Sequence, residues 1–490
     1  MSDQALAQAL AQLAKAVEGL EKRQKDISGT PDAQLIFGPG GLFSNYGLDN
    51  TVVNLSITPR GISDLIPAYG TVITDPVFAY LTGFEPDGGA EPDGPCDDAP
   101  GGVMETAHQV AQFGRIARAS KEMEVNQLMQ ILNGHLTTDL RLLGDVVSPG
   151  HALMPQAGMD GKGFLKSVMK TQLAIIGIEF QRKLSQMIWS GDPANNTNGG
   201  YAEFPGLDML ISTGKVDAFT GVLVPSLDSD IKDFGYNAVD SEAPDILEYL
   251  SMMMFYLQHT ASGTNLDPVD WVLVMRPELF FELTAVWPCR YLTNRCTPSM
   301  YTASDGTLRP GGAVVINDTN NVAMRDEMRN GMFLYINGIR VPVRTDDGIP
   351  EDNSITSARL VPGEFASDIY ILPLRAKGMP VLYWEYLDYT GAMADVTQFT
   401  QKGRFWTTDG GRYMWTLQDL NYCFKVQGKI EPRVILRTPQ LAGKIQNVKY
   451  SPLQKIKSPF PESPYFVKGG NEEYSTPPTY YSEWNEPQKN

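Results

Sequence analysis

Residues that build catalytic and metal sites are scarce in this chain. Its 490 residues include only four cysteines and four histidines. Cys289 and Cys296 lie seven apart with no histidine nearby, and the other two cysteines stand alone, so we expect reduced thiols and neither a disulfide scaffold nor a zinc site. The phosphate-loop, dinucleotide, zinc-protease and serine-hydrolase motifs are also missing. We therefore predict no catalytic residue, no cofactor and no metal.

Long hydrophobic runs and excess positive charge are missing too. No stretch approaches the roughly 18 apolar residues of a membrane span, and the first residues do not read as a secretory signal. With 40 Lys and Arg against 57 Asp and Glu, the net charge is −17, which excludes a free-standing DNA-binding protein. The 42% hydrophobic and 20% charged composition is that of a globular protein, long enough for several domains.

The dominant feature is a long amphipathic segment that ends abruptly in a glycine-rich stretch. Asp160 can cap its start, and Gly191 followed by Pro193 can end it. The pattern predicts a helix of about 28 residues, roughly 40 Å long. We expect 195–200 to be a loop that 201–207 closes with aromatic residues and a Pro-Gly turn. The residues at helical spacing are Leu165, Met169, Leu173, Ile176, Phe180, Leu184 and Met187.

The N-terminal region reads as a helix followed by an extended arm. Residues 3–27 carry a seam of about three heptads, either an assembly arm or a helix lying on its own domain. Residues 34–70 are rich in glycine and proline, so we expect an extended arm without a core of its own.

A hairpin with an acidic tip is expected next. Residues 71–84 and 103–118 read as its two strands. Six acidic residues fall between Glu85 and Asp98. They lack the alternating ligands and closing glutamate of a calcium loop, so an exposed acidic tip is the favoured interpretation.

The rest of the chain alternates helices and strands and ends in a tail. The dipeptide Asn337-Gly338 predicts a two-residue hairpin turn. Met252, Met253 and Met254 are interpreted as core filler. The last 40 residues are rich in proline and tyrosine and cannot form a core. We expect helices at 122–143, 244–260 and from Pro277, and strands at 271–275, 368–373, 381–386 and within 412–434, the last forming a sheet that closes on the long helix.

Several motifs, in this order, resemble HK97-fold major capsid proteins of tailed bacteriophages. The long helix ends in W-x-G-D at 189–192 and continues into G-x-x-x-x-P-G-L at 200–207. A P-x-x-W-V strand at 268–272 and a P-x-x-x-x-x-L helix at 277–283 are similar to the A-domain of that family. The resemblance implies an α+β, HK97-like capsid fold with an N-arm, an E-loop hairpin, a P-domain with a long spine helix, and an A-domain.

The resemblance also implies a division of the chain. The expected parts are an N-terminal heptad helix (1–30), an extended N-arm (31–70), the E-loop hairpin with its acidic tip (71–120), the P-domain with the spine helix and glycine-rich loop (121–210), the A-domain with parts of the P-domain sheet (211–400), closing P-domain strands (401–450) and a Pro/Tyr-rich C-terminal tail (451–490).

Assembly is the function that the resemblance implies. Subunits would form hexamers and pentamers of an icosahedral shell around double-stranded DNA, in a virion assembled in the host cytoplasm, with portal, scaffold and decoration proteins as further partners and no membrane. No lysine lies between Lys25 and Lys121, so we expect no hairpin lysine cross-link of the kind some relatives form. An encapsulin-like compartment and a tail or baseplate protein remain alternatives.

Two sets of residues are the candidate contacts. Lys162, Lys166 and Lys170 form a row at i, i+4 spacing, which can face packaged DNA, solvent or an acidic neighbour. The candidate subunit contacts are Leu6, Leu10, Leu13, Val17 and Leu20 of the heptad seam, and Asp87, Asp93, Asp97 and Asp98 of the acidic tip.

Overall fold

The structure is a computed structural model of the whole chain. It describes residues 51–53, 61–84, 104–119, 123–124, 141–143, 163–198, 202–241, 243–293, 300–302, 308–310, 319–353, 359–361, 363–390, 405–420 and 423–452. The heptad helix, the acidic tip and the C-terminal tail predicted from the sequence lie outside these ranges.

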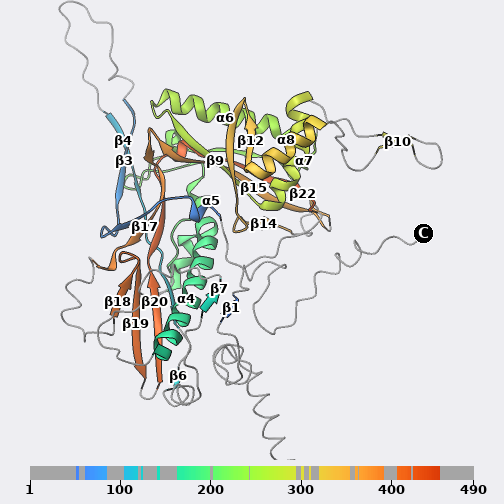
Figure 1. Ribbon diagram of the computed structural model, residues 1–490. Helices are drawn as coiled ribbons and strands as arrows, with labels where there is room; N and C mark the ends of the chain where they lie inside the picture. Colours follow the sequence, from blue (N-terminus) through green and yellow to red (C-terminus); the bar gives the residue numbers. More distant parts are fainter. Residues whose placement is uncertain are drawn as a thin grey trace, which may run out of the picture.

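An eight-stranded mixed sheet lies at the centre of the larger lobe (Figure 1). Strands β9 and β15 pair antiparallel in its middle, while β13 runs parallel to β9 and β8 parallel to β22. Two short strands, β14 (Glu351–Asp352) and β16 (Met379–Pro380), also pair with β15. The order across the sheet is β12 (Phe333–Ile336), β13 (Ile339–Thr345), β9 (Val269–Met275), β15 (Phe365–Ala376), β22 (Gly443–Tyr450) and β8 (Asp230–Asp233).

The two faces of this sheet belong to two hydrophobic cores. Alternate residues of β15 point to opposite sides, as the pleat requires. Ile369 and Ile371 enter the core that also holds side chains of helices α6 (Ile246–Gly263), α7 (Pro277–Thr293) and α8 (Thr319–Gly331). Tyr370 and Leu372 enter the core of the long helix α4 (Gly163–Ser190). The central sheet therefore separates a helical layer from the long helix.

The long helix is confirmed, with the predicted length of 28 residues. Its described inward side chains are almost fully buried: Leu173, Ile176, Phe180, Leu184 and Met187. It lies along a second sheet, ordered β18 (Phe405–Thr408), β19 (Tyr413–Leu420), β20 (Cys423–Ile430) and β5 (Ile116–Ala119). The Phe180 ring stacks on Tyr413, with ring centroids 6.0 Å apart. The closing sheet predicted over 412–434 thus packs on this helix as expected.

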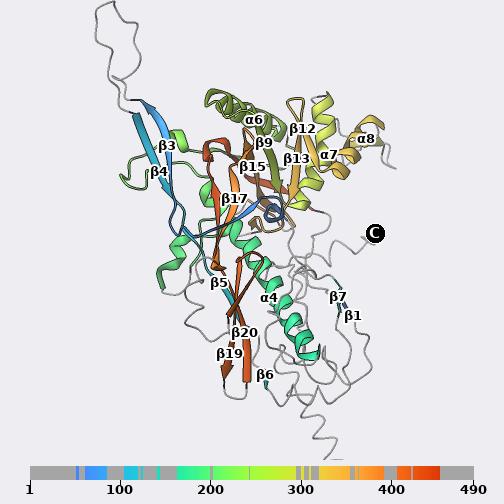
Figure 2. The same ribbon diagram turned by 60° about the vertical axis from the view of Figure 1, so that its left-hand side comes forward.

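A third sheet carries the projecting hairpin. Its order is β2 (Ala68–Thr71), β17 (Leu382–Leu387) and β21 (Pro432–Leu436). From it, β3 (Val77–Phe84) and β4 (Met104–Val110) extend away from the body as an antiparallel pair (Figure 2). The antiparallel hairpin strands predicted from the sequence are confirmed. They are shorter than expected because the adjoining segments, β2 and β5, belong to other sheets. Two further pairs are β1 (Thr51–Val53) with β7 (Arg141–Leu143), and β10 (Met300–Thr302) with β11 (Leu308–Pro310).

Most of the remaining local predictions are confirmed. α6, α7, β9, β15 and β17 cover the predicted helices and strands. Asn337 and Gly338 form the turn between β12 and β13 with φ of 50° and 78°, the left-handed values of a type I′ turn. Met253 and Met254 are buried as predicted, but Met252 is 40% exposed.

Two expectations were wrong. The helix predicted at 122–143 is wrong at its two described ends, β6 (Met123–Glu124) and β7, because pairing with β20 and β1 outweighs the local helical pattern there. Residues 125–140 lie outside the described ranges. The loop expected at 195–200 includes part of a 3-10 helix, η3 (Pro193–Asn198). The described part of the arm expected at 34–70 forms no core of its own, and its Ile62 and Ile66 join the core of α4 instead.

Candidate functional site at the base of the β3–β4 hairpin

One buried arginine fixes both strands of the hairpin at their root. Arg433 of β21 is fully buried, and its Nε donates a 2.8 Å hydrogen bond to Oε2 of Glu385 on β17. Its remaining nitrogens donate to the carbonyl oxygens of Ile73 (3.1 Å) and Thr74 (2.6 Å), which precede β3, and of Ala111 (3.3 Å), which follows β4. The guanidinium fork therefore connects three chain segments in one fixed geometry.

An aromatic neighbour completes this root. The Arg433 guanidinium lies 3.9 Å from the centroid of the Phe113 ring, just beyond β4. A desolvated cation over an aromatic face is attracted by the ring quadrupole. We call Arg433, Glu385 and Phe113 the root clamp.

The inner face of the hairpin rests on the body through rings. Arg437 lies over the Phe78 ring, 5.0 Å from its centroid, and over the Tyr383 ring at 5.7 Å. Burial raises the pKa of Tyr80 to about 12, partly offset by the positive charge of Arg437. These contacts pack the inner face of the hairpin against the body.

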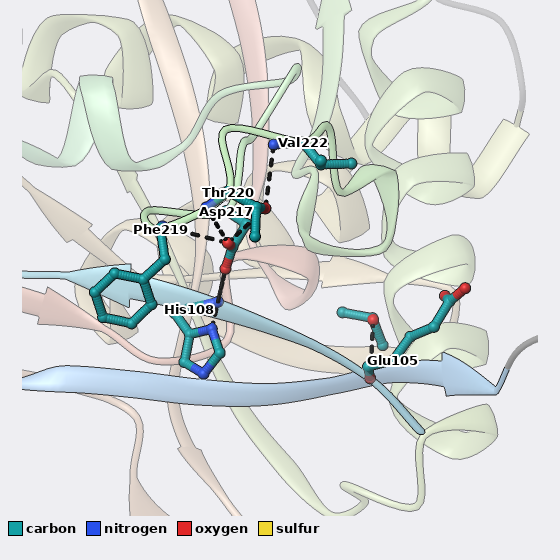
Figure 3. A network of polar contacts seen from close by, with 7 residues as sticks. Glu105, His108, Asp217, Phe219, Thr220 and Val222 are labelled. Carbon is teal, nitrogen blue, oxygen red and sulfur yellow. Dashed lines mark hydrogen bonds and ion pairs between the residues drawn. The ribbon is translucent and has the colours of Figure 1, made fainter. Parts of the chain in front are cut away.

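The opposite edge of the hairpin is held by hydrogen bonds to a single carboxylate (Figure 3). Asp217 lies in the connection between α5 (Leu207–Leu210) and β8. Its Oδ1 accepts from the backbone N of His108 on β4 (2.5 Å) and lies 3.1 Å from the Nδ1 of the same residue. In return, the backbone N of Ala218 donates to the carbonyl oxygen of His108 at 2.8 Å.

The second oxygen of Asp217 organises its own turn. Oδ2 accepts from the Thr220 hydroxyl (2.7 Å), the Thr220 backbone N (2.7 Å) and the Phe219 backbone N (3.2 Å). These bonds, led by that of the Thr220 hydroxyl, hold the pKa of the Asp217 carboxyl well below its usual range. The Phe219 ring leans on His108, with ring centroids 5.0 Å apart. Asp217 is therefore an ionised acceptor shared between the turn and β4.

The outer face of the hairpin is apolar and open. Val77 and Leu81 of β3 are 47% and 60% exposed, and they share a face because strand residues alternate. A second apolar surface lies on α6, where Met252, Phe255 and Tyr256 are exposed on one side of the helix. Large exposed apolar groups of this kind mark surfaces that other macromolecules cover.

Two neighbouring carboxyls, the buried Asp346 and the partly buried Asp347, lie where the N-terminal arm meets the body. Asp346 Oδ2 accepts from the backbone N of Ile62 at 3.0 Å, and Oδ1 accepts from that of Gly348 at 2.9 Å. Burial raises the pKa of Asp346, and it raises that of Asp347 to about 6, with the charge of Asp346 adding to the effect. Arg276 partly opposes both shifts.

These shifts predict a stability that depends on pH. A carboxyl whose pKa is raised on folding binds its proton more tightly in the folded state, so stability falls as pH rises from about 4 to about 6. Asp347→Asn should remove this loss and be more stable than the parent chain at pH 7.5 by up to about 3 kcal/mol, with little difference near pH 4. Urea unfolding at the two pH values measures it. An equal stability difference at both would contradict the assignment.

The residues predicted as contacts from the sequence do not form this site. Lys166 and Lys170 belong to the first turns of α4, and Lys162 precedes the described part of that helix. The predicted subunit contacts lie outside the described residues: Leu6, Leu10, Leu13, Val17, Leu20, Asp87, Asp93, Asp97 and Asp98.

Sequence reasoning missed Arg433, Glu385 and Asp217, although two of them leave a signal. Arg433 interrupts PRVIL, a strand of five buried residues, and a charge in such a strand needs a partner. Asp217-Ala218-Phe219-Thr220-Gly221 has the composition of a turn organised by an aspartate. Neither signal names the partner residue.

The described ranges hold no group of three His, Cys, Asp or Glu side chains arranged to bind a metal. Among the described helices, none combines the length and the apolarity needed to cross a membrane.

Comparisons with known proteins show similarity at the level of structure. No family model and no curated protein matches the sequence. Similar solved structures are mostly phage capsid proteins, with an encapsulin among them. Their identities to this chain are 8–12%, and their TM-scores are 0.34–0.42.

Three of these structures illustrate the range. The capsid of cyanophage A-1(L) is 12% identical, with a TM-score of 0.42, over 79% of this chain and 91% of that one. The capsid of Myoviridae phage XM1 is 11% identical, with a TM-score of 0.39, over 82% and 96%. The SrpI encapsulin of Synechococcus elongatus is 8% identical, with a TM-score of 0.38, over 81% and 89%.

Proposed function

We propose that this chain is the major capsid protein of a tailed bacteriophage, with an HK97-like fold, and that it acts by self-assembly rather than catalysis. The β3–β4 hairpin carries the proposal. It rests one face on its own body through Phe78 and Tyr80 and leaves Val77 and Leu81 open on the other. A two-stranded ribbon is marginally stable alone in water, so a projecting, apolar hairpin needs a surface to lie on. A neighbouring copy supplies that surface in a shell.

The root clamp supports this role. A hairpin that lies across a neighbour has to transmit force to its own body without detaching. Arg433 meets that need because it binds carbonyl oxygens on both sides of the hairpin and is itself buried against Glu385. The apolar side of α6 provides a second contact surface, far from the hairpin in the chain. Many modest contacts of this kind are sufficient for a closed shell, because each is repeated in every subunit.

The finer parts of the proposal concern the assembled particle. Copies form hexamers and pentamers of an icosahedral shell that encloses double-stranded DNA, assembled in the host cytoplasm and retained in the virion. The heptad seam and the acidic tip contact neighbouring subunits or scaffold, portal and decoration proteins, and the row of Lys162, Lys166 and Lys170 faces the DNA. With no lysine between Lys25 and Lys121, the hairpin holds no lysine cross-link.

Electron microscopy of the purified full-length chain tests the proposal. We expect the purified chain to form closed shells. We expect particles from infected cells to contain double-stranded DNA that is protected from nuclease. Shells that contain a folded cargo protein instead of DNA would favour an encapsulin-like compartment. A chain that forms no shells, rings or sheets at any salt or protein concentration would refute the shell assignment and favour a tail or baseplate protein.

A single charge on the outer face of the hairpin should stop assembly without unfolding the chain. Leu81→Lys places an ammonium on a side chain that is 60% exposed, so the monomer loses little. In the shell the change recurs in every subunit contact, and we expect the assembled fraction to fall at least about tenfold. Sedimentation of the purified variants measures it.

The matched control is Met379→Lys on β16, a strand that pairs with β15 and not with the hairpin, where the side chain is 67% exposed. We expect it to assemble like the parent chain. Equal assembly of Leu81→Lys and Met379→Lys would rule out the hairpin face as a subunit contact.

A further inference from the structure

The hairpin is held from two sides at the same level of the ribbon. Ala79 of β3 pairs with His108 of β4, and Tyr80 pairs with Ala107. On one side, Arg437 lies over the rings of Phe78 and Tyr383, and Tyr80 is largely buried. On the other side, the turn at 215–224 meets β4 at His108 through hydrogen bonds to both backbone atoms and the ring. Tilting of the hairpin affects the two sides differently. Hydrogen bonds depend steeply on distance and angle, whereas packed rings can shift against each other and stay in contact.

We propose that the 215–224 turn is a releasable catch that fixes the angle of the β3–β4 hairpin, with Asp217 as its closing group and the root clamp as the pivot. The catch bonds to His108, part of the way along β4, whereas the clamp bonds to residues beyond the ends of both strands. Breaking the catch therefore frees the hairpin to tilt while leaving it attached.

The geometry of the turn makes release possible without unfolding. Its own backbone bonds run from Asp217 N to Val222 O (2.8 Å), Gly221 N to Asp217 O (2.9 Å) and Val224 N to Lys215 O (2.7 Å). Three of the Asp217 side-chain bonds also stay within the turn. The turn thus keeps its shape when it separates from His108, and the same carboxylate is ready to close again.

The contact between the Phe219 and His108 rings aligns the turn with β4. Phe219 is 65% exposed, yet it leans on His108 at the point where the hydrogen bonds form (Figure 3). Closer to the tip, the hairpin is tied within itself, as by the Thr82 hydroxyl, which donates to Glu105 O at 3.1 Å. The hairpin therefore moves as one body once the catch opens.

Hydrogen exchange of the unassembled full-length chain tests the catch. Asp217→Asn keeps the size of the side chain but removes the charge that makes its bonds strong. We expect amides of 104–110 to exchange about ten to a hundred times faster, with α4 and β15 unchanged. Asp228→Asn is the matched control, because Asp228 Oδ1 accepts from Lys215 N at 2.9 Å at the base of the same turn.

Each outcome decides the proposal. Faster exchange in 104–110 for Asp217→Asn, but not for Asp228→Asn, supports the catch. Faster exchange confined to 215–224 would overturn it, since Asp217 would then serve its own turn alone. If Asp217→Asn accelerates exchange everywhere, His108→Ala decides, because that side chain is 29% exposed and its loss spares the core. A rise in 104–110 for His108→Ala supports the catch and no rise overturns it. None of these results depends on shell formation.

Discussion

Arg433→Ala should destabilise the chain by about 3–5 kcal/mol and detach the root of the hairpin. The substitution leaves Glu385 without the partner that its Oε2 now binds, and it removes the donor of three backbone carbonyl oxygens. Removing one member of a buried ion pair costs this much because the other charge stays desolvated. Urea unfolding measures the loss, and limited proteolysis measures the hairpin, where cleavage near 73–77 and 111–113 should accelerate.

Two further variants separate charge, geometry and burial. Arg433→Lys keeps the charge but loses the planar fork, so we expect it to restore only part of the stability. Arg344→Ala, at an exposed position of β13, is the control and should change stability by less than about 0.5 kcal/mol. If Arg433→Ala cost no more than Arg344→Ala, the root clamp would have no role in holding the hairpin.

The double variant Arg433→Met with Glu385→Leu separates the effect of the clamp on stability from its effect on the attachment of the hairpin. A well-packed apolar pair can replace a buried ion pair with little loss of stability. It cannot bond to the carbonyl oxygens of Ile73, Thr74 and Ala111. We therefore expect core stability to recover towards that of the parent chain while proteolysis at the hairpin root stays fast.

The features predictable from sequence are those that depend on near neighbours in the chain. The spacing of Leu173, Ile176 and Phe180 predicts α4 because helical burial repeats every three to four residues. Asn337-Gly338 predicts its turn because few residue pairs accept two positive φ values. At 123–124 the same local reasoning failed, since β6 takes its partner from β20, about three hundred residues away.

The hairpin mounting depends on distant neighbours, so the sequence could not give it. Arg433 bonds to carbonyl oxygens more than three hundred residues earlier, and Asp217 bonds to His108 across 109 residues. Local pattern says that a buried arginine needs a partner, but Glu385, Asp388 and Glu431 are all acidic residues of neighbouring segments. Only the antiparallel register of β17 on β21, which places Glu385 opposite Arg433, selects one of them.

The glycine-rich stretch after α4 was recognised from sequence, and the structure shows why it needs glycine. The backbone N of Gly206 donates to Gly191 O at 2.7 Å, so the returning chain crosses directly over the end of the helix. A Cβ on Gly206 would lie 2.4 Å from Trp189 O and 2.7 Å from Gly191 N. Both are backbone atoms, which cannot move aside as a flexible side chain would.

Gly206→Ala should therefore destabilise the chain by about 3 kcal/mol or more, because the two backbones must separate and their hydrogen bond is lost. The matched control is Gly263→Ala at the end of α6, where a Cβ would meet no atom within 4 Å. That variant should be neutral or gain about 0.5–1 kcal/mol. Equal urea midpoints for the two variants would show that the two backbone segments can move apart at little cost and would contradict the prediction.

The consequence of Gly206→Ala should extend beyond the crossing itself. Leu207 is fully buried in the core of α4, and Asp208 accepts a 2.8 Å hydrogen bond from the Tyr370 hydroxyl and pairs with Lys444. Tyr370 and Lys444 belong to β15 and β22, so these contacts tie the end of the long helix to the central sheet. Because the crossing sets where Asp208 lies, hydrogen exchange in β15 and β22 should accelerate together with that of α5. Faster exchange in α5 alone would show that the central sheet holds its place without this tie.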